Sequence, residues 1–81
     1  MLVKVLAGQK KAATYLYVPA DANVDELPDS LLGLLGELRE VLELEVTSER
    51  QLARCSGHEV LASILESGYY LQLPPVEFAR S

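Results

Sequence analysis

The chain has 81 residues, which is enough for one small domain. Hydrophobic residues make up 49% and charged residues 23%, with a formal net charge of −5, so the composition is globular and acidic and excludes a disordered chain. No apolar run reaches the roughly 18 residues of a membrane span, no signal-peptide pattern opens the chain, and a single cysteine excludes an internal disulfide framework. These features indicate a small intracellular α/β domain with few residues to spare for a deep pocket.

The first predicted elements are two strands. Leu2–Leu6 is a short apolar run interrupted by Lys4, and Thr14–Val18 is rich in aromatic and β-branched residues. The small and polar residues between them predict a turn, so the simplest pairing is an antiparallel hairpin. Pro19 ends the second strand, because its nitrogen carries no hydrogen to donate to a neighbouring strand.

A short helix and a third strand follow an acidic loop. Pro28 stands at a first helical position, several leucines after it form an apolar face, and Gly36 is typical of a residue just past a helix end. Leu42–Val46 then alternates apolar residues with Glu43 and Glu45, which is the clearest strand pattern in the chain. One face of the sheet near this strand should therefore be wet or covered by something polar.

A second helix and a last strand complete the pattern. Ser56 and Glu59 have the spacing of a capping box, apolar residues follow at helical spacing, and Gly68 ends the helix. Tyr69–Leu73 predicts the last strand, which the following pair of prolines stops.

The tyrosines give the main functional signal. In a strand, Tyr15 and Tyr17 share a face, whereas Tyr69 and Tyr70 take opposite faces, so at least one tyrosine of the last strand points away from the main core. Tyrosine is enriched at protein-binding hot spots and also stacks on nucleobases. The structural alternative is a ring that covers the edge of the core while its hydroxyl reaches water. The predicted interaction surface consists of Tyr15, Tyr17, Arg50, Tyr70, Gln72 and Pro74.

Other polar side chains have both a functional and an ordinary interpretation. Lys10 and Lys11, at the tip of the hairpin, are candidate phosphate contacts or a solvated turn. Cys55, three residues before a histidine, could be a nucleophile beside its base, or a packed thiol at a helix start. Glu43 and Glu45 resemble paired catalytic carboxylates, or a solvated strand face. We prefer the ordinary interpretation for each of these groups, so the sequence predicts no catalytic residue, cofactor or metal ligand.

Two tyrosine blocks are specific beyond composition. Thr14–Val18 and Gly68–Pro75, together with Leu27–Leu32 and Glu49–Arg54 between them, resemble the YcgL-domain family of bacterial proteins. The resemblance runs from about Val3 to Pro75, and we expect residues 1–75 to form a single domain and residues 76–81 a C-terminal tail. It implies an α/β/α sandwich in the cytoplasm of Gram-negative bacteria, and it implies no catalytic residue, cofactor or substrate. Genes of such proteins often lie near those for ribonuclease D or the Min division system, which hints at RNA metabolism or division.

The predicted fold is α/β, at the border with α+β. It consists of a small mixed four-stranded sheet in the order β-β-α-β-α-β within an α/β/α sandwich. The third layer could be reduced, because the chain stops soon after Pro75, where relatives often continue into a further helix.

The predicted function is a cytoplasmic, non-enzymatic interaction module with a protein partner and no membrane contact. Two alternatives stay open. One is an accessory RNA-binding domain that uses Lys10, Lys11 and the tyrosines. The other is a small hydrolase or nuclease that uses Cys55 or the strand glutamates.

Overall fold

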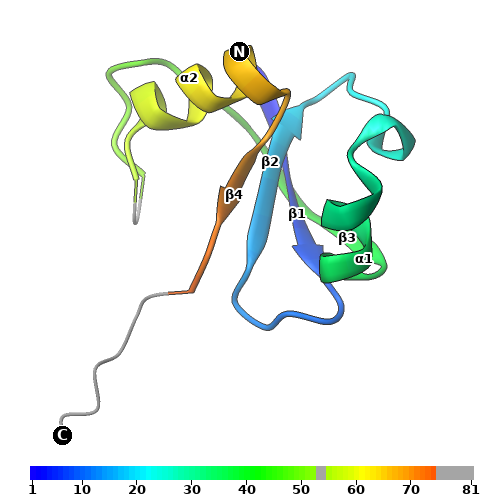
Figure 1. Ribbon diagram of the computed structural model, residues 1–81. Helices are drawn as coiled ribbons and strands as arrows, with labels where there is room; N and C mark the ends of the chain where they lie inside the picture. The colour runs from blue at the N-terminus through cyan, green and yellow to red at the C-terminus, as the bar shows by residue number, and fades with distance from the viewer. Residues whose placement is uncertain (53–54, 75–81) are drawn as a thin grey trace, which may run out of the picture.

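Four strands and two α-helices make up the described part of the chain, residues 1–52 and 55–74, in the computed structural model (Figure 1). They follow the predicted order β-β-α-β-α-β. In chain order they are β1 (Leu2–Gly8), β2 (Tyr15–Pro19), the 3-10 turn η1 (Val24–Glu26), α1 (Asp29–Leu35), β3 (Leu38–Glu45), α2 (Gly57–Ser67) and β4 (Tyr70–Gln72).

The strands form one sheet in the order β3-β1-β2-β4. The hairpin of β1 and β2 is antiparallel as predicted, and the pairs β1–β3 and β2–β4 are antiparallel too. The four-stranded sheet is confirmed, but its strand directions are not mixed. The reason is topological: β2 and β3 run the same way with β1 between them, and β1 and β4 run the same way with β2 between them, so no parallel strands are neighbours.

Each face of the sheet is covered by one helix, which gives the predicted α/β/α sandwich with a single short helix in each outer layer. Side chains alternate between the two faces along each strand. The α2 face buries Val3, Val5 and Tyr17 against Val60 and Ile64 of α2. The α1 face buries Leu6, Leu16 and Val18 against Leu31 and Leu35 of α1.

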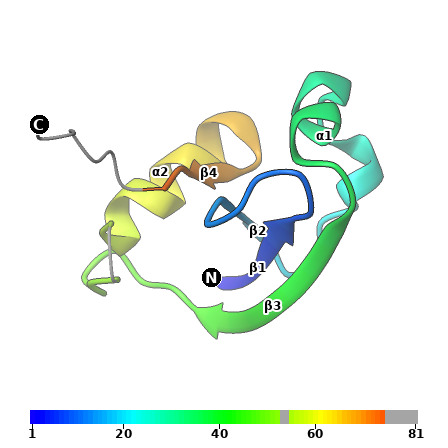
Figure 2. The same ribbon diagram turned by 90° about the horizontal axis from the view of Figure 1, so that it is seen from below.

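The edge strand β3 lies largely outside this packing. Figure 2 shows it curving along the side of the molecule opposite to both helices, and most of its residues are exposed. It begins at Leu38, four residues before the predicted strand. The register with β1 shifts between Val5 and Leu6, so that Val41 is an extra residue on β3. This bulge interrupts the alternation of apolar and polar residues. The first half of the strand therefore does not continue the two-residue period by which the second half was predicted.

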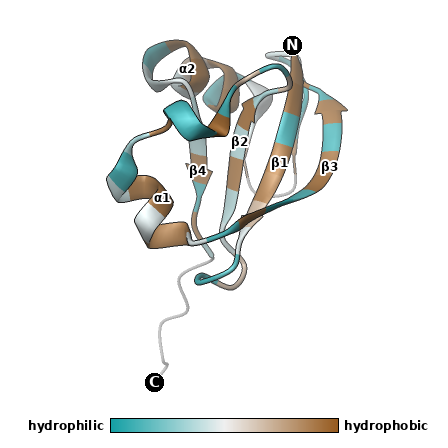
Figure 3. Ribbon diagram, turned by 90° about the vertical axis from the view of Figure 1, so that its right-hand side faces the viewer, coloured by the Kyte–Doolittle hydropathy of each residue, from teal (hydrophilic) through white to brown (hydrophobic). Residues whose placement is uncertain are grey.

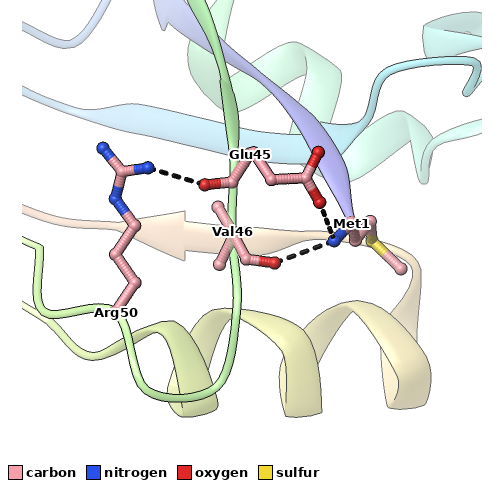
Figure 4. Close-up of polar contacts among 4 residues, drawn as sticks. All are labelled: Met1, Glu45, Val46 and Arg50. Carbon is pink, nitrogen blue, oxygen red and sulfur yellow. Dashed lines mark hydrogen bonds and ion pairs between the residues drawn. The ribbon is translucent and has the colours of Figure 1, made fainter.

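The end of β3 is held by a group of polar contacts (Figure 4). The terminal ammonium of Met1 donates to Glu45 Oε2 at 2.7 Å and to the Val46 carbonyl oxygen at 2.8 Å. Arg50 Nη1 donates to the Glu45 carbonyl oxygen at 2.8 Å. Val46 itself is fully buried, so these contacts fix the place where the chain leaves the sheet edge and enters the core.

Helix α2 begins with the predicted capping box. Ser56 Oγ accepts from the backbone N–H of Glu59 at 3.2 Å, and Glu59 Oε1 accepts from the backbone N–H of Ser56 at 3.1 Å. The next residue, Gly57, donates its N–H to the Arg50 carbonyl oxygen at 2.6 Å. A Cβ at Gly57 would collide with the carbonyl oxygen of Thr47, so only glycine lets the helix start lie this close to the preceding loop.

We expect Gly57→Ala to lower the free energy of unfolding by about 2 kcal/mol or more, because the contact is with backbone that cannot rotate away. The matched control is Gly33→Ala in α1, where an added Cβ would meet no atom within 4 Å. That substitution should raise the free energy of unfolding by about 0.5–1 kcal/mol, because alanine favours the helix. Urea unfolding of both variants measures the difference, and equal effects would contradict this account.

Candidate functional site

Four of the six residues predicted to form an interaction surface are neighbours on the α2 face. Tyr17 lies opposite Tyr70, and Tyr15 lies opposite Gln72, across the β2–β4 pair. Tyr69 belongs to the cluster on the α1 face, so the two consecutive tyrosines take opposite faces as predicted.

The structure makes two of these four residues part of the core. Tyr17 is 8% exposed and Gln72 is 9% exposed, and the Tyr17 hydroxyl donates to Gln72 Oε1 at 3.4 Å. Gln72 Nε2 donates to Cys55 Sγ at 3.5 Å. The rings of Tyr17 and Tyr70 meet edge to face, with centroids 5.6 Å apart. The hydrogen-bonded side chains of Tyr17 and Gln72 therefore lie beneath Tyr70, which is only half-buried. We call Tyr17, Tyr70 and Gln72 the tyrosine layer.

Burial raises the pKa of Tyr70 above its usual value of 10.0, and the neighbouring Cys55 adds to the shift through its charge and a hydrogen bond. Both effects favour the protonated phenol. Tyr70 therefore presents a neutral ring and hydroxyl at physiological pH.

The other two residues of the predicted surface lie apart from this layer. Arg50 is exposed and holds the end of β3 through the Glu45 carbonyl oxygen. Pro74 is exposed just beyond β4. The tyrosine layer and the contacts of Arg50 thus belong to different parts of the fold.

The two lysines of the hairpin turn have different environments. Lys10 Nζ donates to the carbonyl oxygen of Gly33 at 3.3 Å, and its stem would meet a Cβ placed at Gly36. It therefore covers the end of α1, where a cation complements the helix dipole. Lys11 is exposed in the turn.

The cysteine and the strand glutamates that were considered as catalytic groups lie on opposite sides of the sheet. Cys55 is buried under α2, whereas His58 in the first turn of that helix is exposed. Glu43 and Glu45 are exposed on the α1 side of β3, beyond the reach of the core. Among residues 1–52 and 55–74, no three histidine, cysteine or acidic side chains are grouped so that they could hold a metal ion.

The structure shows one exposed surface of which only Tyr15 was predicted from the sequence. The register across β3, β1 and β2 brings Arg39, Ala7 and Tyr15 into one row on the α2 face, next to the bulge. Val41 is 43% exposed and Leu42 is 47% exposed beside this row. We call Ala7, Tyr15, Arg39, Val41 and Leu42 the open corner.

Helix α2 does not reach the open corner. It crosses the sheet near the N-terminus, away from the β1–β2 turn, and it packs on β2 and β4 (Figure 1). The sequence signal that could have found this corner is weak, because the bulge places Val41 out of phase with the alternation of Leu42 and Leu44.

Comparison with known proteins covers almost the entire chain. A family model described as the YcgL domain matches residues 3–75. The chain belongs to the YcgL domain family. This agrees with the resemblance carried by the two tyrosine blocks, and the model spans both of them.

Relatives in the YcgL family come from several bacteria. A YcgL domain-containing protein of Hahella chejuensis is 41% identical over 94% of this chain and 72% of its own length. One from Saccharophagus degradans is 41% identical over 93% and 82%. One from Hydrogenovibrio crunogenus is 35% identical over 99% and 82%. The family name describes a domain and not an activity. In the described residues of this YcgL domain, no helix is long and apolar enough to cross a membrane.

The raised pKa of Tyr70 predicts a pH dependence of stability. Because the folded state binds the phenolic proton more tightly than the unfolded chain does, this stabilisation is complete below pH 10 and is lost as the pH rises through the folded pKa. Tyr70→Phe should therefore reduce the loss of unfolding free energy between about pH 8 and about pH 11. Tyr69→Phe, on the opposite face, is the control. An identical pH profile for both variants would contradict the prediction.

Proposed function

We propose that this YcgL domain is a cytoplasmic, non-enzymatic interaction module that binds a protein partner on the α2 face of its sheet. The observation that supports this is the open corner, where Val41 and Leu42 expose apolar side chains that neither helix covers. Apolar side chains exposed side by side on a small domain are typical of a contact surface, whereas single ones are ordinary.

The chemistry of the open corner suits a protein partner. Tyrosine and arginine are among the residues that contribute most to protein interfaces, and Tyr15 and Arg39 flank Ala7 in one row. Arg39 is exposed and forms no ion pair with any of residues 1–52 and 55–74. A partner could therefore pack on Leu42 and accept hydrogen bonds from Arg39 through its backbone carbonyl oxygens, without first breaking an internal contact.

The tyrosine layer would extend this surface towards β4. Tyr70 is half-buried and Pro74 is exposed, so both are available for contact, and Tyr17 and Gln72 support Tyr70 from below. The proposed role of Arg50 is to fix the end of β3 that pairs with Leu2, at the opposite end of the strand from Arg39, through its hydrogen bond to the Glu45 carbonyl oxygen.

RNA binding has less support. Phosphate contacts need cations that are free to reach the backbone of the nucleic acid. Both lysines of the hairpin turn are exposed, but Lys10 is engaged with the end of α1, which leaves Lys11 without a hydrogen bond to that helix. The net charge of −5 also repels a polyanion.

Photo-cross-linking in the native bacterium tests the proposal. A benzophenone amino acid placed at Leu42 should capture one protein, and Arg39→Glu in the same chain should remove that adduct. The control position is Leu65, an even more exposed leucine on α2. Equal adducts from Leu42 and Leu65, or an adduct that survives Arg39→Glu, would argue against a partner at the open corner.

A further inference from the structure

The outer edge of β3 is the longest unpaired strand edge in the described chain. β3 has eight residues and pairs with β1 on one side, and no strand of residues 1–52 and 55–74 pairs with its other side. An edge strand presents a row of backbone N–H and C=O groups that a further strand can bind. The opposite edge of the sheet is formed by β4, which has only three residues.

The two faces of β3 differ in chemistry, as the alternating colours of the edge strand in Figure 3 show. Leu42 and Leu44 lie opposite Val5 and Val3, so they belong to the α2 face. Glu43 lies opposite Lys4, and Glu40 and Glu45 also lie on the α1 side. A strand added at this edge would meet Leu42 and Leu44 on one face and carboxylates on the other.

We propose that β3 binds an extended segment of a partner protein in which basic residues alternate with apolar ones. The inference rests on the proposed function and names how the partner binds at the open corner. The apolar residues of the segment would pack on Val41 and Leu42, and its lysine or arginine residues would face Glu40 and Glu43. Backbone hydrogen bonds between β3 and the segment would provide the affinity. The alternation of basic and apolar side chains in the segment would provide the specificity.

The carboxylates are available for such a partner. Glu45 contacts the terminal ammonium of Met1 at 2.7 Å, but Glu40 and Glu43 form no ion pair with another described residue. Both are exposed. The net charge of −5 also favours the approach of a basic segment.

A second copy of this chain is a poor occupant of the same edge. In an antiparallel pair of β3 strands, residues opposite each other must belong to the same face. Registers centred on the acidic half of β3 place Glu43 opposite Glu43 or Glu45 of the other copy. Like charges directly opposite each other destabilise a strand pair. The acidic face thus opposes self-association and accepts a basic strand.

The test uses a blocked eight-residue peptide of alternating lysine and valine, measured against the full chain by calorimetry and by amide chemical shifts. The peptide should shift the amides of residues 41–45. Glu40→Lys together with Glu43→Lys should weaken binding by about tenfold or more. The matched control, Glu26→Lys together with Glu66→Lys, changes the same charge at exposed sites elsewhere and should leave the affinity within about twofold.

Two further peptides separate strand addition from simple charge attraction. N-methylation of every valine blocks one edge of the peptide, and N-methylation of every lysine blocks the other, so one of the two should lose binding. Equal binding of both, or equal binding of a glutamate–valine peptide, would overturn the proposal. Shifts confined to residues outside β3 would also overturn it, as would concentration-dependent dimerisation through β3 in sedimentation experiments.

The outcome can be distinguished from that of the proposed function. If the lysine–valine peptide fails to bind while Leu42 still cross-links to a protein in cells, strand addition is wrong and the interaction module stands. If the cross-link also depends on Glu40 and Glu43, both proposals gain support from independent measurements.

Discussion

The architecture depends on the pairing of β1 with two strands at once. Its residues face β2 along one edge and β3 along the other, and their side chains alternate between the α2 and α1 faces. Val3 and Val5 therefore enter the core beneath α2, and Leu6 enters the core beneath α1. One central strand therefore contributes side chains to the hydrophobic clusters on both faces of the sheet, so that a short chain can form two clusters with only four strands.

The local signals in the sequence were sufficient for most of the elements. The capping box at Ser56 and Glu59 and the glycine at Gly68 define α2, because they satisfy backbone groups within a few residues of each other. The sheet order and the role of Lys10 could not be predicted in this way. Both depend on contacts between residues far apart in the chain, such as Lys10 with Gly33, and these leave no periodic signal.

The candidate site shows the same division. Alternation correctly placed Tyr15 and Tyr17 on one face and separated Tyr69 from Tyr70. It could not show that Gln72 would receive the Tyr17 hydroxyl and lie over Cys55, because those three residues meet only after β4 pairs with β2. Because Tyr17 and Gln72 are buried, they cannot contact a partner directly. The proposed partner contact therefore falls on the more exposed residues beside them and on the open corner.

The bulge at Val41 has a consequence for how this domain tolerates changes in chain length. Leu42 pairs with Val5 and Glu40 pairs with Leu6, so Val41 has no partner of its own on β1. Loss of that one residue would leave every strand pair intact, with alternation continuous from Leu38 to Glu45. The edge strand would then be straighter, and its side chains would alternate regularly between the two faces. Straight and regular edge strands are the ones that pair most readily with strands of neighbouring chains. The extra residue therefore makes the edge irregular, and this irregularity acts together with the carboxylates of β3 against pairing with another copy.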